Sequence, residues 1–155
     1  MESAVKTYNT LEAEIESVIK FLQNEEFRYN GILSWECSLD PEVDTSVTIP
    51  NLLIQTFVEN AIKYGIFQNP LGGKVDVSIN KSNIGVLIMI SDNGIESPDS
   101  SEVRKHQKER LKILDSYLLL FNQKHPCLVS YKILNRSSYE IDRTGTRVLI
   151  TLGFQ

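Results

Sequence analysis

The sequence is poor in the residue types that build metal centres, disulfide frameworks and nucleic-acid surfaces. It has two cysteines and two histidines among 155 residues, and they form no cluster that would suggest a zinc site. Cys37 and Cys127 lie far apart in apolar, strand-like stretches, which favours two free thiols in a reducing cytosol over a disulfide. The net charge of −4 comes without any basic block, which argues against a nucleic-acid partner.

Membrane features are also missing from the sequence. No apolar run approaches the length of a membrane span, and the acidic, polar start at Met1, Glu2 and Ser3 is unlike a signal peptide. What remains is the composition of an ordinary soluble domain, with 41% hydrophobic and 23% charged residues. A chain of 155 residues is long enough to bury one sizeable core.

Hydrophobic periodicity predicts a helix, a strand, a helix, two strands, a helix and two further strands, in that order. Helices packed on one face of a mixed, mostly antiparallel sheet would bury this pattern in a two-layer α+β fold. The pattern alone leaves several α+β folds open. The expected helices span 9–28, 50–65 and 102–121, and the expected strands span 32–38, 74–80, 86–91, 127–134 and 147–152.

Local signals predict where two of these helices begin and end. Asn9 is expected to cap the first helix, with Glu12 as its reciprocal partner three residues later. Pro50 is expected at the first position of the second helix, where its missing N–H is no loss. Gly65 is expected to end that helix in a left-handed conformation.

The second helix carries a polar stripe on an otherwise apolar surface. Gln55, Glu59 and Lys63 recur at every fourth position, and Asn60 lies beside them. Polar side chains on one side of a largely buried helix indicate a functional site. The alternative is a solvent-facing stripe with a Glu59–Lys63 ion pair.

The sequence of this stretch, IPNLLIQTFVENAIKYGI from residue 49, resembles the N box of the GHKL ATPases, and specifically that of the LytS-type sensor histidine kinases. That box runs as Pro, apolar residues, Gln, apolar residues and then Glu-Asn-Ala-apolar-Lys-(His or Tyr)-Gly. The resemblance implies a Bergerat-type α/β sandwich over residues 31–155. It also implies that residues 1–30 form a linker helix from phosphoacceptor and dimerisation helices that are absent from this chain.

The resemblance assigns roles in binding ATP and magnesium. Asn60 would be the magnesium ligand, because the metal prefers oxygen donors. Glu59 would be the catalytic carboxylate that polarises the accepting group or a water. Lys63 would reach a phosphate, and Tyr64, at a position where the family commonly has His, would cover part of the nucleotide. Gln55 belongs to the same ATP-binding set.

Two further short motifs fit the resemblance. Asp92-Asn93-Gly94 matches the start of the family's Asp-x-Gly-x-Gly box, in which the Asp accepts a hydrogen bond from the adenine amine and the Gly allows close backbone approach. Gly145 and Thr146 match the family's final Gly-Thr, whose hydroxyl acts beside that Asp. Each motif taken alone is also an ordinary turn signal.

The sequence departs from the family pattern in the region that would cover the phosphates. Glu96 replaces the second glycine of the first box, and residues 100–106 contain no glycine where a Gly-x-Gly lid is expected. Glu96 and Glu102 act against a triphosphate there, whereas Arg104 and Lys105 can substitute in part. Adenine recognition is therefore expected to be intact and the phosphate lid eroded.

The function implied by the resemblance is the ATP-binding catalytic domain of a two-component sensor histidine kinase. His106 and His125 lack the setting of a phosphoacceptor, so the γ-phosphoryl would pass to a His outside this chain, which could not autophosphorylate alone. The expected partners are the upstream helices and a response regulator, without nucleic acid or direct membrane contact, in the cytosolic part of an inner-membrane kinase. The alternative is a degenerate, non-catalytic GHKL module that signals through protein contacts and binds nucleotide weakly or not at all.

Overall fold

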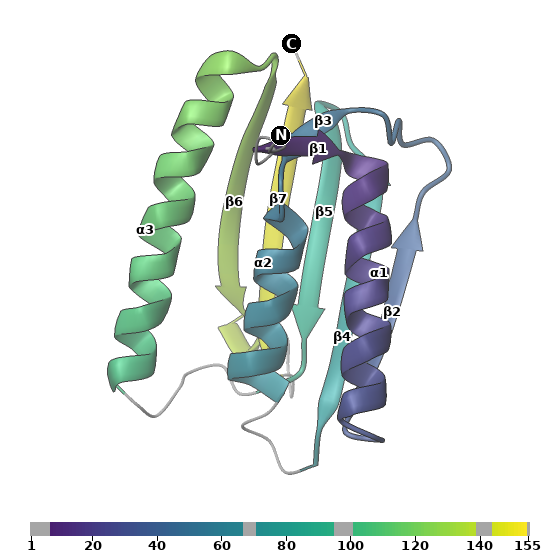
Figure 1. Ribbon diagram of the computed structural model, residues 1–155, viewed down its shortest axis with the longest axis vertical. Coiled ribbons are helices and arrows are strands. Elements are labelled where there is room, and N and C mark those ends of the chain that lie inside the picture. The colour runs from purple at the N-terminus through teal and green to yellow at the C-terminus, as the bar shows by residue number, and fades with distance from the viewer. Residues whose placement is uncertain (1–6, 67–70, 95–100, 139–143, 155) are drawn as a thin grey trace, which may run out of the picture.

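The fold has two layers, with three helices on one face of a five-stranded sheet (Figure 1). The computed structural model describes residues 7–66, 71–94, 101–138 and 144–154. The strand order is β2-β4-β5-β7-β6, with β2 parallel to β4 and every other neighbouring pair antiparallel. This confirms the predicted mixed, mostly antiparallel sheet. The strands are β2 (Leu33–Leu39), β4 (Gly73–Lys81), β5 (Gly85–Asp92), β6 (Cys127–Asn135) and β7 (Thr146–Phe154).

A second, two-stranded sheet holds the start of the chain and was not predicted. It pairs β1 (Tyr8–Thr10) with β3 (Thr48–Pro50) in antiparallel register. The prediction that Pro50 begins a helix is therefore wrong. Pro50 ends a short strand, a position at which its missing N–H costs no ladder bond.

Helix α1 (Leu11–Arg28) begins one residue later than predicted. Thr10, and not Asn9, is the N-cap, and its Oγ1 accepts a hydrogen bond from the N–H of Ala13 at 3.2 Å. The N–H of Glu12 donates to the carbonyl of Thr45 at 2.9 Å. The expected Asn9–Glu12 capping box is thus replaced by strand pairing at Asn9 and by bonds from the helix to the loop before β3.

Helix α2 (Leu53–Asn60) is short and continues as a π-helical turn, Ala61–Ile66. Its N-cap residue, Leu52, has a left-handed backbone with φ of 62° and provides no side-chain cap. Gly65 lies inside the π-helical turn without a positive φ, so the predicted left-handed end at Gly65 is wrong. The wider turn carries the chain to Ile66 before the helix ends.

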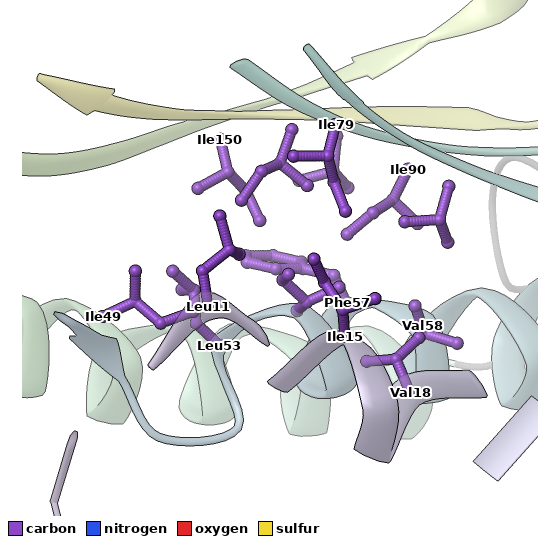
Figure 2. Packing of buried hydrophobic residues seen from close by; sticks show 14 of the residues in the cluster. Leu11, Ile15, Val18, Ile49, Leu53, Phe57, Val58, Ile79, Ile90 and Ile150 are labelled. Carbon is purple, nitrogen blue, oxygen red and sulfur yellow. The ribbon is translucent and has the colours of Figure 1, made fainter. Parts of the chain in front are cut away.

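The core lies between the sheet and helices α1 and α2. Figure 2 shows the sheet side chains Ile79, Ile90 and Ile150 facing those of the helices. Phe57, on α2, is 2% exposed and points toward the strands. Alternation on the strands and a stripe on each helix produce this arrangement, as the hydrophobic pattern predicted.

Helix α3 (Ser101–Lys124) packs on the outer strand β6. Leu118 and Phe121 are buried and Leu111 and Leu114 are half-buried, as predicted, whereas the side chain of Val103 lies outside the described residues. Over the described ranges, no helix is both long enough and apolar enough to cross a membrane.

The two cysteines are free thiols, as predicted. Cys37 is on β2 and Cys127 on β6, at opposite edges of the sheet. Burial raises the pKa of both thiols above their ordinary value, which favours their protonated form.

Replacing Leu52 by asparagine is expected to raise the free energy of unfolding by about 0.5–1 kcal/mol, because asparagine adopts the left-handed conformation at lower cost than leucine. Leu52 is 48% exposed, so few packing contacts are lost. In the control Leu52→Val, a β-branched side chain should lower the free energy by about 1 kcal/mol. Urea unfolding measures both changes, and equal stabilities for the two variants would contradict the backbone conformation assigned to this residue.

Candidate functional site

A cavity of about 210 Å³ lies where α2, its π-helical turn and α3 meet the ends of β5, β6 and β7. Apolar side chains form much of its wall, among them Phe57, Ile90, Leu111 and Val148. The sequence-predicted site residues in the wall are Asn60, Tyr64, Asp92 and Thr146. A mostly apolar wall with a few placed polar groups is typical of a small-molecule site.

Asp92 places a carboxylate in this wall at the end of β5. The residue is 4% exposed, and its Oδ1 accepts a hydrogen bond from the N–H of Gly94 at 2.9 Å. Arg136 donates from Nη1 to the Asp92 carbonyl oxygen at 3.1 Å and so fixes the end of the strand. A buried carboxylate facing an apolar cavity can accept a hydrogen bond from a ligand amine and give the site its specificity.

Three glycines allow the backbone to close around Asp92. A Cβ at Gly65 would lie 3.0 Å from Asp92 Oδ1, and one at Gly94 would lie 2.3 Å from the carbonyl carbon of Gly65. A Cβ at Gly145, where φ is +109°, would lie 1.9 Å from the Asp92 carbonyl oxygen. Gly94 and Gly145 are thus required by contact with neighbouring backbone, not only by a turn.

Asn60 is another polar residue of the cavity wall. Its Oδ1 is buried and has no hydrogen-bond partner within the part of the chain that the structure describes, although the residue lines the cavity. An unsatisfied buried acceptor costs roughly 1–3 kcal/mol, so a ligand or ion there would be stabilising. An amide oxygen is a suitable Mg²⁺ ligand, and the site therefore fits the metal that the sequence implied.

Protein groups alone do not complete a metal site. The described residues contain no group of three or more His, Cys, Asp or Glu side chains that could hold an ion. Mg²⁺ characteristically binds one or two protein ligands together with substrate phosphates and waters. Asn60 can supply such a ligand.

Gln55 and Glu59 lie on α2 outside the cavity wall. Gln55 Nε2 donates to Glu59 Oε1 at 3.0 Å, and both residues are half-buried. The alternative Glu59–Lys63 ion pair is not formed, since Lys63 extends over the ring of Tyr64 with its Nζ 5.3 Å from the centroid.

A second hollow adjoins the cavity at Tyr64. Lys63, His106 and Arg110 line it together with the tyrosine. Lys63 and Arg110 are basic side chains, so this hollow is suited to an anion next to the polar end of the cavity. Sequence reasoning assigned no role to Arg110, although it belongs to the Glu-Arg-Leu run at 109–111.

Several residues of the site had no clear signal in the sequence. Gln107 and Asn135 line the cavity, and Arg136 is buried against Asp92, although the run around Arg136 had the composition of a turn. Of the lid positions, Glu96 lies outside the described residues, as do the side chains of Glu102 and Arg104. Lys105 is exposed on α3.

Sequence comparison gives relatives that cover part of the chain. No protein-family model matches it. Over 86 residues, 55% of its length, the chain is 35% identical to the sensor histidine kinase/phosphatase LytS of Staphylococcus aureus strain MRSA252, and the matched part makes up 15% of that protein. LytS of strain N315 gives the same identity and coverage. The chain is thus a homologue of LytS over this segment and spans a small part of that relative.

Solved structures agree on the fold. The catalytic domain of the histidine kinase ThkA superposes with a TM-score of 0.61 at 14% identity, over 97% of this chain and 98% of that one. The mycobacterial sensor histidine kinase MprB gives a TM-score of 0.59 at 16% identity, over 97% and 99%. The chain has the fold of histidine kinase catalytic domains, which confirms the expected α+β sandwich. The sequence match to LytS confirms the resemblance to the LytS-type kinases.

Gly145→Ala is expected to lower the free energy of unfolding by about 2–4 kcal/mol, because the added methyl group would collide with the Asp92 carbonyl at an unfavourable backbone angle. Gly153→Ala, on the strand β7 that directly follows Gly145, is the matched control. Its Cβ would meet no heavy atom closer than 3.8 Å, so its effect should stay within about 1 kcal/mol. Urea unfolding distinguishes the two variants, and a neutral Gly145→Ala would refute the close approach.

Proposed function

We propose that this chain is the ATP-binding catalytic domain of a sensor histidine kinase, which uses Mg–ATP to phosphorylate a histidine outside the chain. The homology to LytS and the fold support this function. The observation that carries it is the cavity itself, because two polar residues line its mostly apolar wall: Asp92, which is buried, and Asn60, whose Oδ1 has no hydrogen-bond partner among the described residues.

Asp92 would recognise the adenine. Its carboxylate accepts a hydrogen bond from the exocyclic amine, and the hydroxyl of Thr146 at the start of β7 contributes to the same edge. Phe57, Ile90 and Val148 supply apolar surface for the planar base. Gly94 and Gly145 allow the neighbouring backbone to pack closely around Asp92 and so hold it in place.

The polar end of α2 would face the phosphates. Asn60 Oδ1 is the protein ligand for Mg²⁺, which when bound neutralises charge on the phosphate oxygens. Lys63 and Arg110 hold the anionic chain in the adjoining hollow. Glu59, next to Asn60, orients or polarises the accepting group. Catalysis of this kind consists mainly of positioning and charge neutralisation.

The rest of the kinase would lie outside the chain. Helix α1, within residues 1–30, would connect residues 31–155 to phosphoacceptor and dimerisation helices, and a response regulator would receive the phosphoryl group. The site would work in the cytosol. Alone, the domain would bind nucleotide without autophosphorylation, because neither His106 nor His125 has the sequence setting of a phosphoacceptor.

Calorimetric titration of the 155-residue chain with ATP, with magnesium and with EDTA, tests this function. Asp92→Ala should weaken binding at least about tenfold in both conditions, because adenine recognition does not involve the metal. Asn60→Ala should weaken binding at least about tenfold with magnesium and much less in EDTA. Asn80→Ala, at an exposed asparagine on β4, is the matched control and should bind like the wild type.

Two results would count against the proposal. Absence of binding by the wild type at millimolar Mg–ATP would overturn nucleotide binding by this chain. If Asn60→Ala weakens ATP binding equally with magnesium and with EDTA, Asn60 does not act as a magnesium ligand. GTP provides a further check, since Asp92 should favour ATP over a base that lacks the exocyclic amine at that position.

A further inference from the structure

Helix α1 buries a charged side chain against α2. Glu14 is 1% exposed, and it lies on the face of α1 that includes Leu11, Ile15 and Val18. A carboxylate in an apolar core is costly unless its oxygens are hydrogen-bonded. Its surroundings must therefore supply donors, and they come from the next helix.

The carboxylate of Glu14 caps the N-terminus of α2. Oε1 accepts a hydrogen bond from the N–H of Leu52 at 3.1 Å, and Oε2 accepts from Ile54 at 2.9 Å and from Gln55 at 3.2 Å. The first N–H groups of a helix have no partner within it, and the N-cap side chain usually supplies one. Leu52 has no side-chain acceptor, so a residue from α1 takes over this role.

The Glu14 carboxylate connects helices α1 and α2 through hydrogen bonds. Burial raises the pKa of the Glu14 carboxyl, while the backbone hydrogen bonds from Gln55, Leu52 and Ile54 lower it. Moving α1 away from α2 would leave a buried acid and three backbone donors without partners. The first turn of α2 is therefore held at a fixed position on α1.

Gln55 extends this connection toward the candidate site. Its backbone N–H binds Glu14, and its side-chain Nε2 donates to Glu59 Oε1 one turn later. Glu59 directly precedes Asn60, which is one of the residues that line the cavity. A continuous series of hydrogen bonds thus runs from α1 through Gln55 to the polar end of α2.

We infer that Glu14 and Gln55 are positioning residues through which helix α1 sets the orientation of Glu59 and Asn60. The inference rests on the proposed function, in which those two residues act on Mg–ATP. Helix α2 has 8 residues and is therefore about 12 Å long, so a shift of its first turn reaches its last residue. Gln55 acts here through Glu59 and not by direct contact with nucleotide.

NMR of the nucleotide-free chain tests the inference without requiring ATP. Glu14→Gln keeps the shape of the side chain but replaces one acceptor oxygen by a donor, so at least one of the three N–H groups loses its partner. The side-chain amide signals of Gln55 and Asn60 should shift in this variant. They should not shift in Glu16→Gln, a matched change at an exposed position of α1.

Titration with Mg–ATP provides the second readout. Glu14→Gln should weaken affinity roughly 2- to 30-fold, the range of a coupling of 0.5–2 kcal/mol, and Glu16→Gln should bind like the wild type. Gln55→Leu breaks only the bond to Glu59 and should also shift the Asn60 signal. The double variant should lose less affinity than the sum of the two single losses in free energy, because both act in one series.

The outcomes separate the two proposals. If the Asn60 signal and the affinity stay unchanged in Glu14→Gln while the amides of residues 52–55 shift, Glu14 is a local cap and the inference is wrong. If Glu14→Gln does not fold, an unchanged Asn60 signal in Gln55→Leu overturns the inference equally. If the wild type binds no ATP, the proposed function fails, and the NMR comparison still decides whether α1 positions Asn60.

Discussion

The helical layer depends on one buried carboxylate. A helix of 8 residues is too short to be stable by itself, and α2 begins with a strained Leu52 that provides no cap. Glu14 satisfies three of its first N–H groups, and Leu53, Phe57 and Val58 anchor the same helix to the apolar core. The position of α2 between α1 and α3 follows from this combination, and so does the position of every polar residue at its far end (Figure 1).

At that far end the constraint is steric. The π-helical turn and the ends of β5 and β7 come so close around Asp92 that Gly94 and Gly145 have no room for a Cβ, while a Cβ at Gly65 would lie only 3.0 Å from Asp92 Oδ1. The π-helical turn carries Tyr64 and Gly65, and both residues lie in the cavity wall. At one end of the cavity the backbone packs closely around Asp92. The cavity wall also includes Asn60, whose side-chain oxygen has no partner among the described residues.

The sequence predicted the order of the elements of the main sheet and helical layer, because the alternation of strands such as β4 and the stripe of α1 are local patterns. It also predicted Asn60, Tyr64, Asp92 and Thr146 as site residues, which the cavity brings together. The predicted ends of the second helix were wrong because tertiary contacts outweighed the local sequence signals. Pro50 pairs with Tyr8 in a short strand, and Gly65 lies within a π-helical turn. Glu14 could not be found in this way, because its partners are backbone groups 38 to 41 positions away and its neighbours on α1 are ordinary acids.

Helix α3 is attached to the sheet unevenly along its length. Leu118 and Phe121 are buried near its C-terminal end, whereas the described side chains from 105 to 117 are exposed or half-buried. Since the free energy of local opening follows buried apolar contact, the N-terminal half of α3 separates from the sheet at lower cost than the C-terminal half. That half carries Gln107 and Leu111, so the part of the cavity wall that α3 forms should open at lower free-energy cost than the closely packed backbone around Asp92. Amide protons should accordingly exchange faster along the first turns of α3 than along its last.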